Sequence, residues 1–183
     1  NALSTRLEVE VKREGGVHRL VFAGGDVIEP LARVGDCGPR TSGTRVRVWP
    51  DGKYFESPRY SMPELERLLR AKAVLLPGVA VTLTIERPSG DEVKVWQYPE
   101  GLKSYLAELC GDDEPIAPLF AGEAYIGEDH EQFAKGEGAQ WAMAWFEDGA
   151  SGESYVNLIP TPSGGTHEAG LRTGVFEAVK SFV

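Results

Sequence analysis

The side chains that most often carry out chemistry in proteins are few and scattered in this sequence. His18, His130 and His167 lie far apart, and no cysteine or carboxylate accompanies them at the spacing of a metal site. The sequence also contains no Ser-His-Asp order with a nucleophile elbow and no Walker-type phosphate loop. It therefore predicts neither a metal site nor a catalytic group within this chain.

One short segment has side chains suited to contacting a ligand. Thr41-Ser42-Gly43-Thr44 leads directly into the alternating segment Arg45–Trp49. A hydroxyl at the start of a strand can hydrogen-bond the edge of a ligand, and Val46 projects from the same face as Thr44. The simpler interpretation is a glycine-containing turn that leads into a strand, and composition alone favours it.

Two further features lie near the C-terminal end. The segment Gly164-Gly165-Thr166-His167 precedes an expected helix, where free amides and the helix dipole can bind an anion. Two glycines also fit a tight loop between closely packed backbones, and we interpret the segment as such a loop. Arg172 and Lys180 follow on the expected helix. They are candidates for contact with DNA, although solvated surface charge is the commoner explanation.

The hydrophobic pattern predicts the elements that must position these residues, and together they indicate an α+β fold. Alternation of apolar and polar residues predicts strands at Leu7–Lys12, Val17–Phe22, Val27–Val34, Arg45–Trp49, Val79–Ile85, Val93–Tyr98, Leu119–Ile126, Gln140–Phe146 and Ser154–Ile159. We expect the first four to form an antiparallel meander with one packed face. Helices are expected after Ser61, around Leu102–Leu109 and after Gly165. A linker-like segment at Cys110–Pro118 places a boundary near Cys110, between parts 1–110 and 111–183.

Composition narrows the function classes. The formal net charge is −9, so this chain should not bind DNA strongly unless its basic residues gather on one face. No apolar run approaches the roughly 20 residues that span a bilayer. Cys37 and Cys110 are expected to be buried thiols in a reducing cytosol. The chain starts at Asn1 without an initiator methionine, so we expect it to be an internal piece of a longer protein.

Several segments together resemble the B subunits of type IIA topoisomerases. They are Asn1–Ser4, Thr41–Pro50 and Glu153–Arg172, and they follow the family's order over essentially the whole chain. Arg70–Val79 and Glu153–Pro160 resemble the topoisomerase IV branch of that family more than gyrase. The resemblance implies that residues 1–110 are the second half of a gyrase and histidine-kinase type ATPase domain, an antiparallel sheet with helices on one face. Residues 111–183 are similar to the first part of the family's α/β transducer domain, which relays nucleotide state to the DNA gate.

The resemblance also implies roles for particular residues. Thr44 matches the threonine that helps to bind adenine through a water shared with an aspartate, and Gly43 stands beside it in the same cofactor-binding segment. Val46 matches an apolar wall of the adenine pocket. Arg13 matches an arginine at the mouth of that pocket, against which many inhibitors pack. Arg172 matches an arginine that faces the cavity through which DNA passes.

The same resemblance places the groups that hydrolyse ATP outside this chain. In the family, the catalytic glutamate, the magnesium-binding asparagine, the adenine-binding aspartate and most of the glycine-rich lid precede Asn1. The lysine that reaches the terminal phosphate follows Val183. Phosphoryl transfer needs a base close to the attacking water and cations to offset developing charge. We therefore expect ATP and Mg²⁺ to act in the complete subunit, and we expect this segment alone to bind neither and to be inactive.

The implied partners are DNA and the topoisomerase IV A subunit, together with a second B subunit in an ATP-dependent homodimer. The resemblance implies a cytoplasmic antibiotic target that decatenates and relaxes DNA by strand passage. Two alternatives stay open. One is the gyrase B subunit, and the other is a non-catalytic protein-binding module that reuses this fold. The module fits the acidic surface and the absence of catalytic groups equally well.

Overall fold

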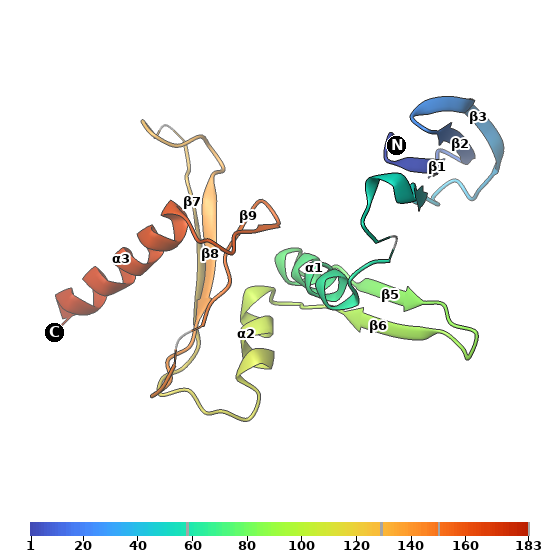
Figure 1. The fold of residues 1–183 in the computed structure, drawn as a ribbon. Helices are drawn as coiled ribbons and strands as arrows, with labels where there is room; N and C mark the ends of the chain where they lie inside the picture. The colour runs from blue at the N-terminus through green and yellow to red at the C-terminus, as the bar shows by residue number, and fades with distance from the viewer. Residues whose placement is uncertain (58, 129, 150, 183) are drawn as a thin grey trace. The chain divides into compact units, whose positions relative to one another are not determined.

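The computed structural model describes residues 1–57, 59–128, 130–149 and 151–182. Within these residues the strands pair antiparallel and are accompanied by α-helices, which confirms the α+β class (Figure 1). The chain divides into two compact units, Asn1–Ser61 and Met62–Val183. No helix in the described part of the chain is long and apolar enough to cross a membrane.

The first unit is built on a four-stranded antiparallel sheet. Its strands are β1 (Ser4–Arg13), β2 (Gly16–Ala23), β3 (Asp26–Asp36) and β4 (Gly43–Pro50), in the order β3-β2-β1-β4. The first three strands form the predicted meander. The prediction was wrong for β4, which pairs with β1 at the opposite edge from β3. The segment between β3 and β4 crosses to that edge past the β1–β2 turn, where the amide of Cys37 donates to the carbonyl of Gly15 at 3.0 Å.

Both hairpins of this sheet have turns of two residues with positive φ. The φ angles are 52° at Glu14 and 77° at Gly15, and 57° at Gly24 and 104° at Gly25. Positive φ at both central residues defines the turn whose twist matches that of antiparallel strands, and glycine adopts it at little cost. These glycines therefore set the register of β1 with β2 and of β2 with β3.

The two faces of the sheet differ in chemistry. One face has the apolar side chains of three strands: Leu7, Val9, Val11, Leu20, Phe22, Val46 and Val48. This face was expected to be packed, but the side chains of β4 are largely exposed on it, with Val46 59% and Val48 44% exposed. Among residues 1–57 and 59–61, the structure has no α-helix that could cover it. We call this surface the open apolar face.

The opposite face is organised around Glu8. Its carboxylate accepts from Arg6 at 2.8 Å and from Arg19 at 3.2 Å. The hydrogen bond from Arg6 and the positive charges of Arg19 and Arg47 lower the pKa of Glu8, against the smaller opposing effect of burial. Val21 pairs with Glu8 across the sheet and is fully buried.

The second unit begins with two helices and a hairpin that share a small core. Helix α1 (Met62–Leu75) is followed by strands β5 (Val81–Ile85) and β6 (Glu92–Trp96) and by helix α2 (Leu102–Cys110). Ala73, Val74 and Tyr98 are buried between them, and Val81, Trp96, Leu102 and Tyr105 pack against this cluster. The amphipathic pattern of the sequence therefore identified both helices and the hairpin.

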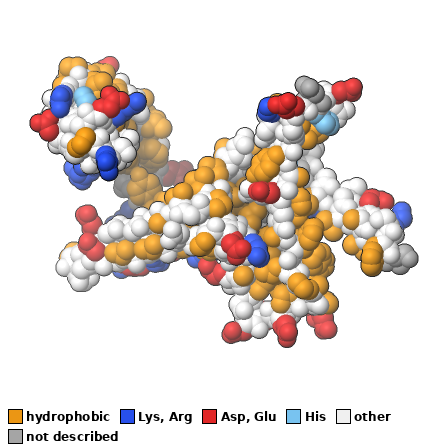
Figure 2. Space-filling model, turned by 180° about the vertical axis from the view of Figure 1, so that it is seen from behind, with side chains coloured by type: hydrophobic (Ala, Val, Ile, Leu, Met, Phe, Trp, Pro, Cys, Tyr) orange, Lys and Arg blue, Asp and Glu red, His pale blue; other side chains and the backbone are white. Residues whose placement is uncertain are grey.

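The rest of the second unit consists of β7 (Phe120–Tyr125), β8 (Gly138–Met143), β9 (Tyr155–Val156), β10 (Ile159–Pro160) and α3 (Thr166–Phe182). β7 pairs with β8. The expected single strand at Ser154–Ile159 was wrong, because Asn157 and Leu158 form a turn and the segment folds into the β9–β10 hairpin. Many apolar side chains remain at the surface, as the orange areas of Figure 2 show; on α3, Phe176 is 63% and Val179 58% exposed.

Candidate functional site

The strand register brings Thr44 and Val46 beside β1. Thr44 pairs with Val11, and Val46 pairs with Val9. Because alternate residues of a strand share a face, all four side chains lie on the open apolar face. Thr44 and Val46 are exposed there, so a hydroxyl and an apolar wall stand next to each other on an accessible surface.

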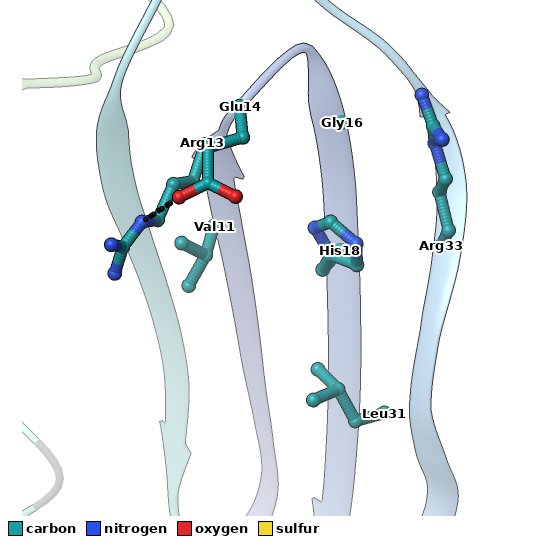
Figure 3. A pocket seen from close by; sticks show the side chains of 7 residues that line it. All are labelled: Val11, Arg13, Glu14, Gly16, His18, Leu31 and Arg33. Carbon is teal, nitrogen blue, oxygen red and sulfur yellow. Dashed lines mark hydrogen bonds and ion pairs between the residues drawn. The ribbon is translucent and has the colours of Figure 1, made fainter.

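A shallow cavity of about 440 Å³ adjoins this group (Figure 3). It is lined by residues of β1, β2 and β3 and of the turn between β1 and β2: Val11, Arg13, Glu14, Gly16, His18, Leu31 and Arg33. Gly16 leaves the room that the imidazole of His18 occupies, since a Cβ at residue 16 would lie 2.8 Å from its Cε1 atom. Val11 contributes to the cavity and also pairs with Thr44, so it joins the two parts of the candidate site.

Arginine side chains stand at the rim of this cavity, each beside a carboxylate. The Nε atom of Arg13 donates to Glu14 at 3.0 Å, and Figure 3 shows its guanidinium turned to the side of β1 away from His18. An Nη2 atom of Arg33 lies 2.6 Å from Asp36. Both arginine side chains are more than half exposed. Exposed ion pairs contribute little energy, so Arg13 can exchange Glu14 for a ligand at small cost.

The segment that leads into β4 is fastened to the β1–β2 turn. The thiol of Cys37 donates to the carbonyl of Gly16 at 3.5 Å, and the amide of Thr41 donates to the carbonyl of Gly38 at 2.9 Å. Cys37 was expected to be buried, but it is half-buried and free. Its contacts place Gly43, which pairs with Lys12, at the start of the strand that presents Thr44.

The structure thus brings together Gly43, Thr44, Val46 and the β1 strand that ends in Arg13. The sequence interpretation missed His18 and Arg33 as neighbours of this group. The signal for His18 was its place in an alternating strand, where a hairpin turning at residues 14 and 15 sets it opposite Val11. No comparable signal existed for Arg33, because irregular pairing in β3 shifts the register on both sides of it.

Arg172 lies in the other unit, on α3. Its guanidinium donates to Glu168, with distances of 3.1 Å from Nε and 2.8 Å from Nη2, and its side chain is 74% exposed. Of the preceding glycines, Gly164 has a φ of +70°, which favours glycine, and a Cβ at Gly165 would lie 2.8 Å from the side-chain ring of His167. The atoms that a Cβ at either glycine would meet belong to the side chains of Glu168 and His167, so the interpretation as a tight loop between closely packed backbones stays a prediction.

Across the residues that the structure describes, no group of three His, Cys, Asp or Glu side chains is arranged to bind a metal ion. The carboxylate of the cavity, Glu14, is paired with Arg13. The site therefore offers a hydroxyl, an apolar wall and guanidinium groups at its rim, which suits a flat heteroaromatic ligand with polar edges better than a metal-dependent reaction.

The family described as DNA gyrase B matches residues 101–183. Among curated proteins, the B subunit of DNA topoisomerase 4 from Escherichia coli strain K12 is 41% identical over all of this chain, and that from Pseudomonas aeruginosa is also 41% identical. This chain covers 28% of the length of each of these two relatives.

Two solved structures share the fold over 99% of this chain. One is the topoisomerase IV ATP-binding domain of Francisella tularensis with a small-molecule inhibitor, at a TM-score of 0.67, 31% identity and 46% coverage of that structure. The other is the 43K ATPase domain of Thermus thermophilus gyrase B with an aminocoumarin, at a TM-score of 0.76, 28% identity and 47% coverage.

Over its whole length the chain is similar to the B subunits of type IIA DNA topoisomerases. Within that family, curated relatives that match its whole length at 34 to 41% identity are topoisomerase IV B subunits, as the sequence predicted. The gyrase B alternative is not better supported.

Proposed function

We propose that this chain is a segment of the ATP-driven B subunit of a type IIA topoisomerase, in which it forms part of the adenine pocket. The observation that carries the proposal is the juxtaposition of Thr44 and Val46 with Val9 and Val11 on the open apolar face. Adenine is a flat base with an apolar face and polar edges. A surface with a hydroxyl set among valines matches both properties.

In this proposal each residue has a separate task. The hydroxyl of Thr44 hydrogen-bonds the polar edge of adenine through a water, and Val46 covers the face of the base. Gly43 keeps the approach to Thr44 open, since apart from Gly43 and its two chain neighbours no heavy atom of the described residues lies within 4 Å of the position of a Cβ there. Arg13 exchanges its exposed ion pair with Glu14 for contact with a ligand at the mouth of the pocket.

The described residues fit adenine but not magnesium. These residues supply a hydroxyl and an apolar wall, which are part of what adenine needs, whereas Mg²⁺ needs oxygen ligands gathered at one point. The carboxylate that lines the cavity, Glu14, is occupied by Arg13. We therefore propose that Mg²⁺ and the general base are supplied by the rest of the subunit, and that this segment alone does not hydrolyse ATP.

The partners of the whole protein are proposed on the same basis. They are DNA, the A subunit and a second B subunit, and the protein works in the cytoplasm, where the bacterial chromosome lies. A net charge of −9 disfavours contact between DNA and most of this surface. Arg172 is proposed as the DNA-facing residue, since 74% of its side chain is exposed. The boundary between an ATPase part at 1–110 and a transducer part at 111–183 stays a prediction.

The whole-protein proposal is tested with the full-length subunit and its A partner. We expect ATP hydrolysis that DNA stimulates, together with decatenation and relaxation of DNA. Introduction of negative supercoils would assign the subunit to gyrase instead. Absence of both ATP hydrolysis and strand passage would favour the protein-binding module. Robust magnesium-dependent ATP hydrolysis by the 183-residue chain alone would refute the segment interpretation.

A further inference from the structure

The turn of the β9–β10 hairpin has an unfavourable backbone conformation. Its two central residues, Asn157 and Leu158, have φ angles of 47° and 70°. Asparagine tolerates positive φ, but the second position of such a turn normally requires glycine, and a leucine there is strained. A strained residue persists only where its surroundings impose the conformation.

A side chain from a distant part of the chain contacts this turn. The Nζ atom of Lys72 on α1 donates to the carbonyl oxygen of Leu158 at 2.5 Å, across 86 residues of sequence. Both residues are half-buried. A charged donor makes a stronger hydrogen bond than a neutral one. This hydrogen bond holds the carbonyl of Leu158 in the orientation that the turn requires.

A second set of hydrogen bonds holds the base of the same hairpin. The hydroxyl groups of Tyr155 and of Tyr105, on α2, both donate to the carboxylate of Glu153, at 2.5 and 3.4 Å. The hydroxyl groups of Ser154 and Thr161 lie 2.7 Å apart. The hairpin is therefore connected to α1 at its tip and to α2 at its base.

We propose that Lys72 is a positioning residue that imposes the strained turn and thereby couples the β9–β10 hairpin to α1. This inference rests on the proposed function, because α1 then lies in the ATPase part and the hairpin in the transducer part. In this role the shape that Lys72 imposes on the turn carries the coupling, so a turn that adopts the same shape without Lys72 would preserve it. Lys72 would act on coupling between ATP use and strand passage, without touching nucleotide or DNA.

A substitution in the turn tests whether Lys72 acts through the turn's conformation. Leu158→Gly gives the dipeptide Asn-Gly, which favours this turn without help from other residues. We compare Lys72→Met, Lys72→Arg, Leu158→Gly and the double variant Lys72→Met/Leu158→Gly in the full-length subunit with its A partner. Lys72→Met is expected to retain basal ATP hydrolysis and its KM while decatenation falls about tenfold, the loss expected for a charged hydrogen bond. Lys72→Arg keeps a cationic donor and should retain most decatenation.

The double variant separates coupling from general stability. If Lys72 acts by imposing the turn, Leu158→Gly restores decatenation in the double variant to within about threefold of the parent, since glycine removes the strain. Unchanged decatenation in Lys72→Met would overturn the proposal, and so would a double variant no better than Lys72→Met. A parent subunit without ATP hydrolysis would refute the proposed function. The effect of Lys72→Met on amide exchange in the β9–β10 hairpin would then still decide whether Lys72 imposes the turn.

Discussion

Replacing Thr44 by valine tests the adenine pocket most directly. Valine has the size and branching of threonine, so Thr44→Val removes the hydroxyl and little else. Thr44 is exposed on β4, an edge strand of the sheet, and among the described residues its hydroxyl has no partner that the substitution would orphan. We therefore expect the midpoint of thermal unfolding to change by no more than about 2 °C, as for a surface substitution.

The expected loss is in ligand affinity. A hydrogen bond between neutral groups contributes about 0.5–1.5 kcal/mol net, which corresponds to a roughly two- to twelvefold weaker Kd. The proposed hydrogen bond runs through a water on an accessible face. We therefore expect a loss of affinity near the middle of this range, with a Kd about fivefold weaker. Thr44→Ser keeps the hydroxyl and should lose less than Thr44→Val.

The assay is calorimetric titration of the full-length subunit with a non-hydrolysable ATP analogue. Thr84→Val is the matched control, since Thr84 is also an exposed strand threonine but lies on β5, in the other unit. It should leave the Kd unchanged. An unchanged Kd for Thr44→Val would refute the role of this hydroxyl, and equal losses in both variants would show that the effect is not specific to the pocket.

Two further predictions concern the second unit. Arg172→Gln in the full-length subunit should reduce DNA-stimulated ATP hydrolysis and spare the basal rate, because it removes an exposed charge from α3. Lys103→Gln, which removes an exposed lysine from α2, is the control, and unchanged stimulation in Arg172→Gln would refute the assignment. Burial and then the hydrogen bond to Glu108 raise the pKa of Tyr98 from 10.0 to about 12. The protonated phenol is thus favoured in the folded state, so this contribution to stability is complete below pH 10 and is lost as pH rises towards 12. The free energy of unfolding, measured with urea between pH 10 and pH 12, should fall more steeply with pH for the parent than for Tyr98→Phe. Parallel curves for the two proteins would contradict the raised pKa of Tyr98.

The local pattern of apolar and polar residues was sufficient to predict most of the secondary structure. The alternation in Leu7–Lys12 and Val17–Phe22 identified β1 and β2, and the Glu14-Gly15 turn between them fixed their pairing. The apolar stripe after Ser61 identified α1. These signals are reliable because a side chain's face depends on its neighbours a few residues away, and periodicity records that directly.

Only part of the candidate site could be predicted from the sequence. Composition favoured a simple turn before Thr44, and the proposed roles of Thr44, Val46, Arg13 and Arg172 came from resemblance to a family. Those roles stay predictions. The sequence did not show that β4 would pair with β1, because the alternating strand Arg45–Trp49 fits either edge of the meander equally well. That choice sets Thr44 opposite Val11.

By itself, then, the sequence determined the α+β class, the existence of most elements and the family, since these depend on local periodicity and on ordered motifs. Only the tertiary structure decided which residues meet: Thr44 with Val11, the thiol of Cys37 with Gly16, and Lys72 with Leu158. Contacts between residues far apart in the chain form only after loop-closure entropy has been overcome. Their partners are chosen by packing over the whole unit, and no local pattern records that choice.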